Sequence, residues 1–360
     1  MQRLRAGCAG LLLACPMAWA APLDALLTAT PERGLDHGSL ELGYDSMNAQ
    51  LDVLNFRSIS SDPDKATGDY RGAHVLAGLR LGEKGWASAS LWQRAVSDST
   101  DTYQYTSWQL AGQYRVREAD GRLPALALRV SGWGNYAAAT DTTKPVVVPG
   151  AKLDSVHITA PDDQQLQADL IGTWELSAAS DLSVLFSLGS SQLHYGGLSA
   201  TTTLDGCHYR LNFSGNAIDG TLAAPCSAGI FLQQFYDNSG RLGIDVANEI
   251  AWRGSFSRAG VNSSWRSGPW LLRAGYLFYV AQRETVDAIL AARKQSAYTQ
   301  NHSITVESSY RFANGLRAVA RGQFSSNLFF NDIPVTYNTS SAARFDGKYS
   351  ILSLGLQADF

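Results

Sequence analysis

The chain ends with Lys348-Tyr349-Ser350-Ile351-Leu352-Ser353-Leu354-Gly355-Leu356-Gln357-Ala358-Asp359-Phe360. Every even-numbered residue from Leu352 to Phe360 is apolar or aromatic, whereas the odd-numbered residues between them are small or polar. Successive side chains of a β-strand point to opposite faces, so this alternation predicts a strand with one apolar and one polar surface. The same period of two recurs along the chain and decides its fold class.

Alternation of this kind is found in about twelve segments of roughly 10 to 14 residues. The cleanest runs from Leu166 to Leu176. The others are Gly38–Met47, Tyr70–Leu81, Trp86–Ser97, Tyr103–Val116, Ala125–Tyr136, Leu182–His194, Ile244–Trp265, Trp270–Ala281, His302–Phe312, Leu316–Ser326 and Lys348–Phe360. An even number of such strands predicts an all-β chain that closes into an antiparallel up-and-down barrel.

The connections between these segments alternate in length. Short turns are expected at 82–85, 117–122, 177–181, 266–269 and 313–315. Longer links are expected at 48–69, 98–102, 137–163, 195–243, 282–301 and 327–347. A barrel that crosses a membrane shows this asymmetry, with short turns on the periplasmic side and long loops outside, and it places both chain ends with the short turns.

Aromatic residues gather at the ends of the expected strands. One set flanks the short turns and the chain end: Trp86, Tyr114, Trp174, Trp265, Trp270, Tyr310, Phe312 and Phe360. A looser second set consists of Trp108, Tyr276, Phe278 and Phe324. Aromatic rings favour membrane interfaces, so the two sets predict two girdles around a transmembrane barrel.

Together with the terminal aromatic strand, these features resemble the bacterial outer-membrane β-barrel proteins, although no single family can be named. The resemblance implies a porin-like transmembrane barrel in the outer membrane that contacts lipid. It also implies that the barrel-assembly machinery recognises the last strand, which ends in Phe360.

The N-terminus is typical of an exported protein. Arg3 and Arg5 precede an apolar run, and Ala18-Trp19-Ala20 has the small-x-small pattern of a signal-peptidase site, so residues 1–20 are expected to be a signal peptide. A lipoprotein signal around Cys15 is the alternative. Residues 21–37 are then expected to be a periplasmic segment, and residues 38–360 the barrel with its external loops.

Composition fits an exported membrane protein. Charged residues make up only 17% of the chain, hydrophobic residues 45%, and 33 residues are glycine. Strands that face lipid on one side need few charges, and a mean hydropathy of -0.12 is compatible with them because the other side is polar. The formal net charge of -3 gives no reason to expect a nucleic-acid partner.

The face opposite the apolar stripe carries more arginine than acid. The inward set is expected to include Arg80, Arg94, Arg115, Arg129, Arg253, Arg273, Arg311, Arg317 and Arg321. The expected acids are Asp169, Glu175, Glu249, Glu307 and Asp359. Guanidinium groups bind carboxylate and phosphate, so this wall predicts a passive channel for small, anionic solutes. The alternative is that the charges cross-link strands within a filled lumen.

Two cysteines remain after the expected signal peptide is removed. Cys207 and Cys226 are predicted to form a disulfide in an oxidising compartment, where it would stiffen the longest external link. His208 beside them gives only a weak indication of zinc, and no cofactor is expected.

An enzyme is a third functional reading, after the channel and a surface-interaction barrel that acts through its external loops. The segment from Tyr236 to Arg241 faintly resembles part of the site of an outer-membrane phospholipase family, but Asp237 stands where that motif requires histidine. Ser191 and His194 are three residues apart, which places them on opposite faces of a strand. A hydroxyl without a base cannot be activated, so no catalytic residue is expected.

Three segments fall outside the strand pattern. Pro22–Thr30 has leucines at helical spacing and is expected to form either a short periplasmic helix or a segment that folds into the lumen. Glu284–Lys294 is expected to be a short helix in an external loop. The link at 137–163 is expected to fold over the pore mouth.

Overall fold

The computed structural model describes residues 24–31, 37–47, 69–97, 101–142, 145–148, 151–224, 226, 232–242, 245–313, 315–327 and 332–360. Twelve antiparallel strands close into one barrel. In barrel order they are β1 (Gly38–Met47), β2 (Tyr70–Leu81), β3 (Gly85–Ser97), β4 (Thr102–Arg117), β5 (Ala125–Tyr136), β10 (Asp162–Glu175), β11 (Ser180–His194), β16 (Trp252–Ser267), β17 (Trp270–Arg283), β18 (Gln300–Arg311), β19 (Leu316–Ser325) and β20 (Tyr349–Asp359). The predicted fold class is confirmed. The expected signal peptide, residues 1–20, lies outside the described residues.

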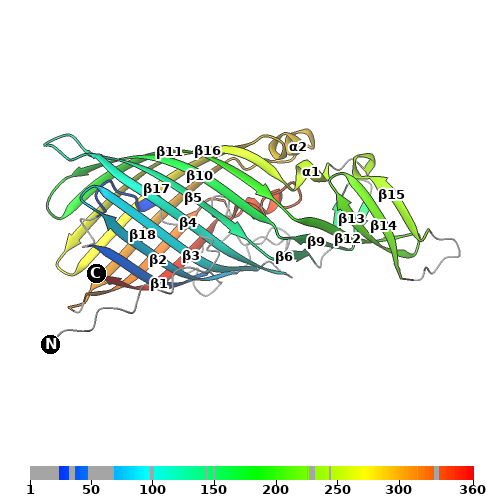
Figure 1. Cartoon of the computed structure of the whole chain (residues 1–360), viewed down its shortest axis with the longest axis horizontal. Coiled ribbons are helices and arrows are strands. Elements are labelled where there is room, and N and C mark those ends of the chain that lie inside the picture. The colour runs from blue at the N-terminus through cyan, green and yellow to red at the C-terminus, as the bar shows by residue number, and fades with distance from the viewer. Residues whose placement is uncertain are drawn as a thin grey trace, which may run out of the picture.

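The last strand closes the barrel against the first. β20 pairs with β1 over eight positions, with Leu356 opposite Leu42. The N–H of Gly38 also donates to the carbonyl of Phe360 at 2.7 Å. Both described ends of the barrel sheet therefore lie at the end with the short turns, as Figure 1 shows at the left.

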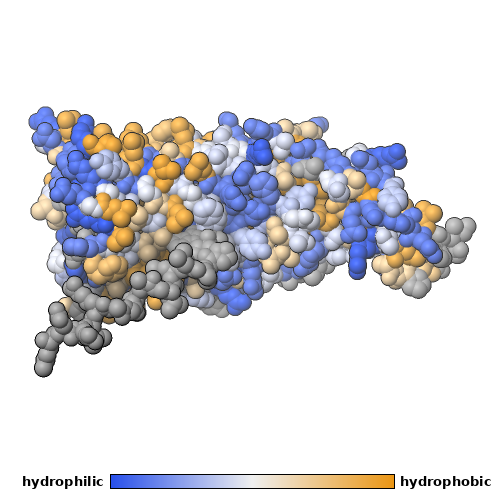
Figure 2. Space-filling view, in the orientation of Figure 1, coloured by the Kyte–Doolittle hydropathy of each residue, from blue (hydrophilic) through white to orange (hydrophobic). Residues whose placement is uncertain are grey.

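The outer face of the barrel carries the apolar half of the alternation. Exposed side chains on this face include Leu40, Leu42, Leu79, Leu110, Leu128, Val130, Leu166, Leu170, Phe186, Leu188, Val261, Ile304, Val306, Leu354 and Leu356. Figure 2 shows orange patches over this part of the molecule, with blue side chains at its left-hand rim. A contiguous apolar band of this extent is unfavourable in water and matches a lipid environment. Within the described residues, no helix is long and apolar enough to cross a membrane.

The barrel wall continues outward as a separate sheet. Its six strands, in sheet order, are β15 (Gln234–Asn238), β14 (Ala217–Ala224), β13 (Cys207–Ser214), β12 (Gly197–Leu204), β9 (Ser155–Thr159) and β6 (Ala139–Thr142). β6 follows β5, β9 precedes β10 and β12 follows β11, so three barrel strands lead directly into this extracellular sheet, which extends to the right in Figure 1. These residues lie in the ranges 137–163 and 195–243, which were expected to be long external links.

Short helices lie near the outer end of the barrel. α2 (Val286–Ala292) confirms the helix expected in the external link. α1 (Val246–Glu249) lies within the range 244–265 that was expected to be one strand, and β16 begins only at Trp252. The remaining helices are 3-10 turns: η1 (Asp24–Leu26), η3 (Ser239–Leu242), η4 (Pro334–Thr336) and η5 (Ala342–Phe345). β7 (Val146–Val148) and β8 (Ala151–Leu153) form a hairpin in the link between β6 and β9. Val147 in this hairpin is 80% exposed. The link at 137–163 was expected to fold over the pore mouth, but its strands β6 and β9 belong instead to the extracellular sheet.

Candidate functional site

The barrel interior is the first candidate site, because the predicted arginines converge there. Six of them are buried or half-buried on the inner wall: Arg94, Arg115, Arg129, Arg273, Arg317 and Arg321. Arg80 and Arg311 are exposed near the periplasmic ends of β2 and β18. Arg80 donates to the carbonyl of Gly82 in the adjacent turn at 3.0 Å. These two side chains therefore belong to the rim of the barrel.

Arg253 is exposed, and its predicted place in the lumen is wrong. The alternation in β16 is set by Trp252, Phe256 and Arg258, which are all buried. An odd-numbered residue between them points outward. Arg258 and Arg266 are inward arginines of this strand, and Arg266 lines the lumen cavity and contacts Asp181 at 2.7 Å. Arg258 was missed because the strand was expected to start at residue 244. Glu249, expected among the inward acids, lies in α1 outside the barrel wall.

Residues 24–31, here called the inner plug, fill part of the lumen. Asp24 is 2% exposed, and its carboxylate forms ion pairs with Arg258 at 2.5 Å and with Arg129 at 3.4 Å. Arg129 also contacts Asp169 on the neighbouring strand at 2.7 Å. The segment expected at the periplasmic surface or in the lumen is thus found in the lumen, where a buried carboxylate joins it to two strands.

The wall also binds the backbone of the inner plug. Asn262 and Gln113 donate side-chain hydrogen bonds to plug carbonyls at 2.7 and 2.9 Å, and the hydroxyl of Thr173 accepts a plug N–H at 2.8 Å. Gly275 allows the close approach, because a Cβ at that position would lie 2.1 Å from the carbonyl oxygen of Ala25. The plug and the wall are therefore complementary in both polarity and shape.

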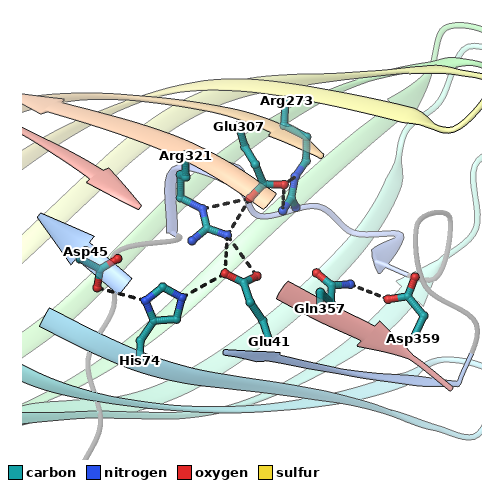
Figure 3. A network of polar contacts seen from close by, with 8 residues as sticks. All are labelled: Glu41, Asp45, His74, Arg273, Glu307, Arg321, Gln357 and Asp359. Carbon is teal, nitrogen blue, oxygen red and sulfur yellow. Dashed lines mark hydrogen bonds and ion pairs between the residues drawn. The ribbon is translucent and has the colours of Figure 1, made fainter. Parts of the chain in front are cut away.

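A second polar network crosses the opposite side of the lumen, as Figure 3 shows. Its members come from five strands: Asp45, His74, Glu41, Arg321, Glu307 and Arg273. The two ring nitrogens of His74 each lie 3.0 Å from a carboxylate oxygen, one of Asp45 and one of Glu41. Arg321 then bridges Glu41 at 3.3 Å and Glu307 at 2.8 Å. Nearly every charge in this network faces an opposite charge.

A cavity of about 220 Å³ lies between the inner plug and this network. Its wall includes Trp86, Gln357 and Arg273, which sit toward the short-turn end of their strands. Trp86 therefore faces the lumen, although it was expected in the membrane girdle. A second hollow of about 20 Å³ lies farther out, and Arg321 borders both spaces.

Residues 332–346, here called the outer plug, close the outer end of the lumen. The plug belongs to the link between β19 and β20, and no local sequence pattern indicated this role. Ile333, Val335, Tyr337 and Phe345 are at most 8% exposed and belong to one apolar cluster with side chains from many barrel strands. The indole N–H of Trp252 donates to the carbonyl of Tyr337 at 2.8 Å.

Polar contacts seal the margin of the outer plug. The carboxylate of Asp332 accepts hydrogen bonds from Gln323 at 3.0 Å and from the hydroxyl of Tyr349 at 2.5 Å. Arg94 lies 3.4 Å from the backbone carbonyl of Asp332. On the other side, the N–H of Val335 donates to Asp163 at 2.6 Å. Hydrogen bonds to several barrel strands therefore hold the margin of the outer plug, in addition to its apolar packing.

Most of the inward arginines are matched by acids. Arg317 contacts Asp359 at 2.7 Å, and Arg115 contacts Glu118 at 2.9 Å. With the pairs of the inner plug and of Figure 3, these contacts correspond to the cross-linking alternative of the sequence analysis. A guanidinium already bound to carboxylate attracts a passing anion weakly.

The serines weighed for catalysis do not meet a histidine in the described contacts. Ser191 is buried and accepts a hydrogen bond from Gln165 at 3.0 Å, whereas His194 is exposed, as the spacing predicted. The Ser239 hydroxyl donates to Asn216 at 3.3 Å. Neither arrangement supplies a base for a nucleophile.

The extracellular sheet is the second candidate site. Cys207 and Cys226 are joined by a disulfide, as predicted. One face of the sheet is covered and apolar, with Ala200, Tyr209 and Leu211 at most 6% exposed. The opposite face is open and polar. A sheet with its own core and cross-link is a rigid surface, not a set of flexible loops.

No protein-family model matches the chain, and no curated protein sequence matches it. Among solved structures, the translocator domain of the autotransporter NalP from Neisseria meningitidis is 14% identical over 91% of each chain, with a TM-score of 0.47. The KdgM porin is 7% identical over 89% of this chain and 99% of its own, with a TM-score of 0.39. The P. putida toluene transporter TodX is 9% identical over 93% of each chain, with a TM-score of 0.36. Likenesses of this size identify neither a family nor a substrate. The closed barrel and its apolar belt define the class by themselves: this is a transmembrane β-barrel of the outer-membrane type.

Proposed function

We propose that this protein is an outer-membrane barrel with a closed lumen that acts at the cell surface through its extracellular sheet. The observation that carries the proposal is the outer plug, because its buried aromatic and aliphatic side chains occupy the outer end of the lumen in a cluster shared with the barrel strands. Opening it would expose Tyr337, Phe345 and their partners, and each large buried side chain favours the closed state by about 1.5 to 3 kcal/mol. A passive channel needs a hydrated path, so the surface role fits the geometry better than permeation does.

The experiment compares two properties of the same cells. Purified protein in planar bilayers should carry no ion current. Cells that display the protein should attach to a surface to which cells without the protein do not attach. Replacing residues 205–226 by a short Gly-Ser link removes the centre of the sheet and should abolish attachment, while the barrel keeps its heat-dependent migration on detergent gels. The matched control is Cys207→Ser with Cys226→Ser, which keeps the sheet strands and should retain most of the attachment.

A steady current from wild-type protein, with attachment unaffected by the loss of the sheet centre, would contradict this function. It would favour the second candidate, a channel for small and anionic solutes. The cavity that reaches Arg321 supports that candidate, because Arg321 also borders the second hollow, which lies farther out. In a salt gradient, an Arg317→Ala, Arg321→Ala variant of such a channel should lose anion preference.

Two further expectations accompany the surface role. We expect no enzymatic activity, because the serines considered have no base. We also expect the barrel-assembly machinery to recognise β20 through Phe360, which is 63% exposed beside the barrel seam. Removal of Phe360 should lower the amount of assembled barrel without changing the amount of exported chain.

A further inference from the structure

The open face of the extracellular sheet carries side chains in straight rows. Pairing aligns one row across five strands: His157, Ser199, Asn212, Asp219 and Tyr236. A second row two residues along the strands contains Ser155, Thr201, Arg210, Thr221 and Gln234. Neighbouring strands lie about 4.8 Å apart, so each row presents polar groups at that interval over roughly 19 Å.

The chemistry of these rows differs from an ordinary solvated surface. Solvated faces are usually rich in lysine and glutamate, with about a quarter to a third of charged residues. Neither row contains lysine or glutamate. The first row continues onto the edge strand β6 with Asp141, which lies 2.5 Å from His157. The charged members are therefore Asp141 and Asp219 against Arg210, while seven of the other members carry hydroxyl or amide groups, which both donate and accept hydrogen bonds.

Contacts within the rows hold the side chains in place. The hydroxyls of Ser155 and Thr201 are 2.7 Å apart. The amide of Gln234 donates to the hydroxyl of Tyr236 at 2.7 Å and to Asp219 at 3.2 Å. The Tyr236 residue is nevertheless 74% exposed, so its ring is available to a partner. A prearranged surface loses little side-chain entropy on binding.

We propose that this face binds a neutral polysaccharide supplied from outside the cell. The inference rests on the proposed surface function and names its ligand class. A sugar chain offers hydroxyl groups in both hydrogen-bonding senses, repeats at an interval similar to the strand spacing, and has apolar C–H faces that stack on an aromatic ring. The rows supply the hydroxyl and amide partners, and Tyr236 supplies the ring.

Other occupants fit less well. A protein partner normally buries a cluster of aromatic and apolar anchors, whereas Tyr236 is the single large aromatic in the two rows. An anionic polymer would need more cations than Arg210 and His157. The sugars of the cell's own outer leaflet lie near the membrane, while the sheet projects away from the barrel along the long axis of the molecule (Figure 1).

The test uses the full-length protein in detergent on an array of neutral linear oligosaccharides of increasing length, with uronate oligosaccharides and the cell's own lipopolysaccharide as competitors. Affinity for the neutral chains should rise with length and level off near the length of a row. Tyr236→Ala should weaken binding about tenfold, the value expected for loss of one stacked ring. Tyr114→Ala, an exposed tyrosine at the periplasmic end of β4, should change nothing.

Asn212→Ala should also weaken binding, while disulfide formation and heat-dependent migration remain normal. The inference is overturned if no neutral chain binds, if uronates or lipopolysaccharide bind better, or if Tyr236→Ala binds like the wild type. Should cells then still attach to a protein-coated surface through the sheet, the proposed surface function survives without its glycan. If neither glycan binding nor cell attachment is found and the protein carries an ion current, the proposed surface function itself is overturned.

Discussion

The inner plug reaches the barrel wall through one buried carboxylate, a few backbone hydrogen bonds and a small apolar cluster around Ala25 and Ala29, whereas the outer plug packs large apolar side chains into a cluster shared with many strands. The first arrangement concentrates its ionic contacts in Asp24. The second distributes its contacts over Ile333, Val335, Tyr337 and Phe345. A buried charge becomes costly when its partner is lost, while a packed cluster loses only the contacts of the side chain that is removed. Single substitutions should therefore release the inner plug but not the outer one.

The largest effect is expected from Asp24→Ala. Arg129 and Arg258 would keep their buried charges without this carboxylate, a change that typically costs about 3 to 5 kcal/mol. In a background with Ala29→Cys, labelling of the thiol by a membrane-impermeant maleimide should become roughly a hundredfold faster or more, since 1.4 kcal/mol corresponds to about tenfold. Asp24→Asn keeps the shape and should give an intermediate rate. Unchanged labelling in Asp24→Ala would show that the inner plug does not depend on the ion pair.

Tyr337→Ala tests whether the stability of the outer plug is distributed over many side chains. Removal of a fully buried aromatic ring should cost about 3 to 4 kcal/mol, yet the neighbouring apolar side chains should keep the outer plug seated. Hydrogen exchange should accelerate for amides in 332–346, and bilayers should still show no current. Tyr236→Ala, which removes an exposed ring, is the matched control and should leave this exchange unchanged. A current opened by Tyr337→Ala alone would mean that the outer plug is a labile gate.

A smaller effect is expected from Thr173→Val. The substitution keeps the side-chain volume but removes the hydroxyl that accepts the plug N–H. Loss of one such hydrogen bond should cost about 1 to 3 kcal/mol at a buried donor. Labelling at Ala29→Cys should accelerate less than in Asp24→Ala. An effect as large as that of Asp24→Ala would show that backbone hydrogen bonds, not the carboxylate, hold the inner plug.

The smallest effect concerns an ionic contact that supports the outer plug from outside the barrel. Glu249 is 6% exposed; burial raises the pKa of its carboxyl, but hydrogen bonds from Arg293 and Thr339 outweigh burial and hold the pKa below its usual value. Because the pKa is lowered in the folded state, the contact contributes stability above the unfolded value of about 4.3, and this contribution is lost as pH falls through the lower folded value.

Hydrogen exchange in α2 should therefore accelerate below about pH 4 in the wild type. Glu249→Gln should remove most of this pH step, while exchange in barrel strands stays the same. A pH step that persists in Glu249→Gln would assign the titration to another group.

Much of the barrel could be predicted from sequence because its signal is local. Period-two alternation located twelve strands, and ten of the predicted starts and ends, including those of Gly38–Met47 and Ala125–Tyr136, coincide with the observed bounds. The error at β16 came from extending the alternation through α1, which reversed the expected side of Arg253. The helix in the external link and the disulfide were also predicted from local signals. The helix followed from the spacing of apolar residues, and the disulfide from the number of cysteines.

The sequence by itself determined a closed antiparallel barrel, its lipid-facing side and its short-turn end, because alternation and turn length act between neighbouring residues. Only the tertiary structure decided that the lumen is partly filled by two plugs and by paired charges. Asp24 meets Arg258 across 234 residues, and Arg321 meets Glu41 across 280 residues. No local pattern encodes such pairs. An inner wall has the same composition whether its charged side chains face water or face each other. The extracellular sheet was hidden for the same reason: its strands are short, and they become a surface only when six of them are paired side by side.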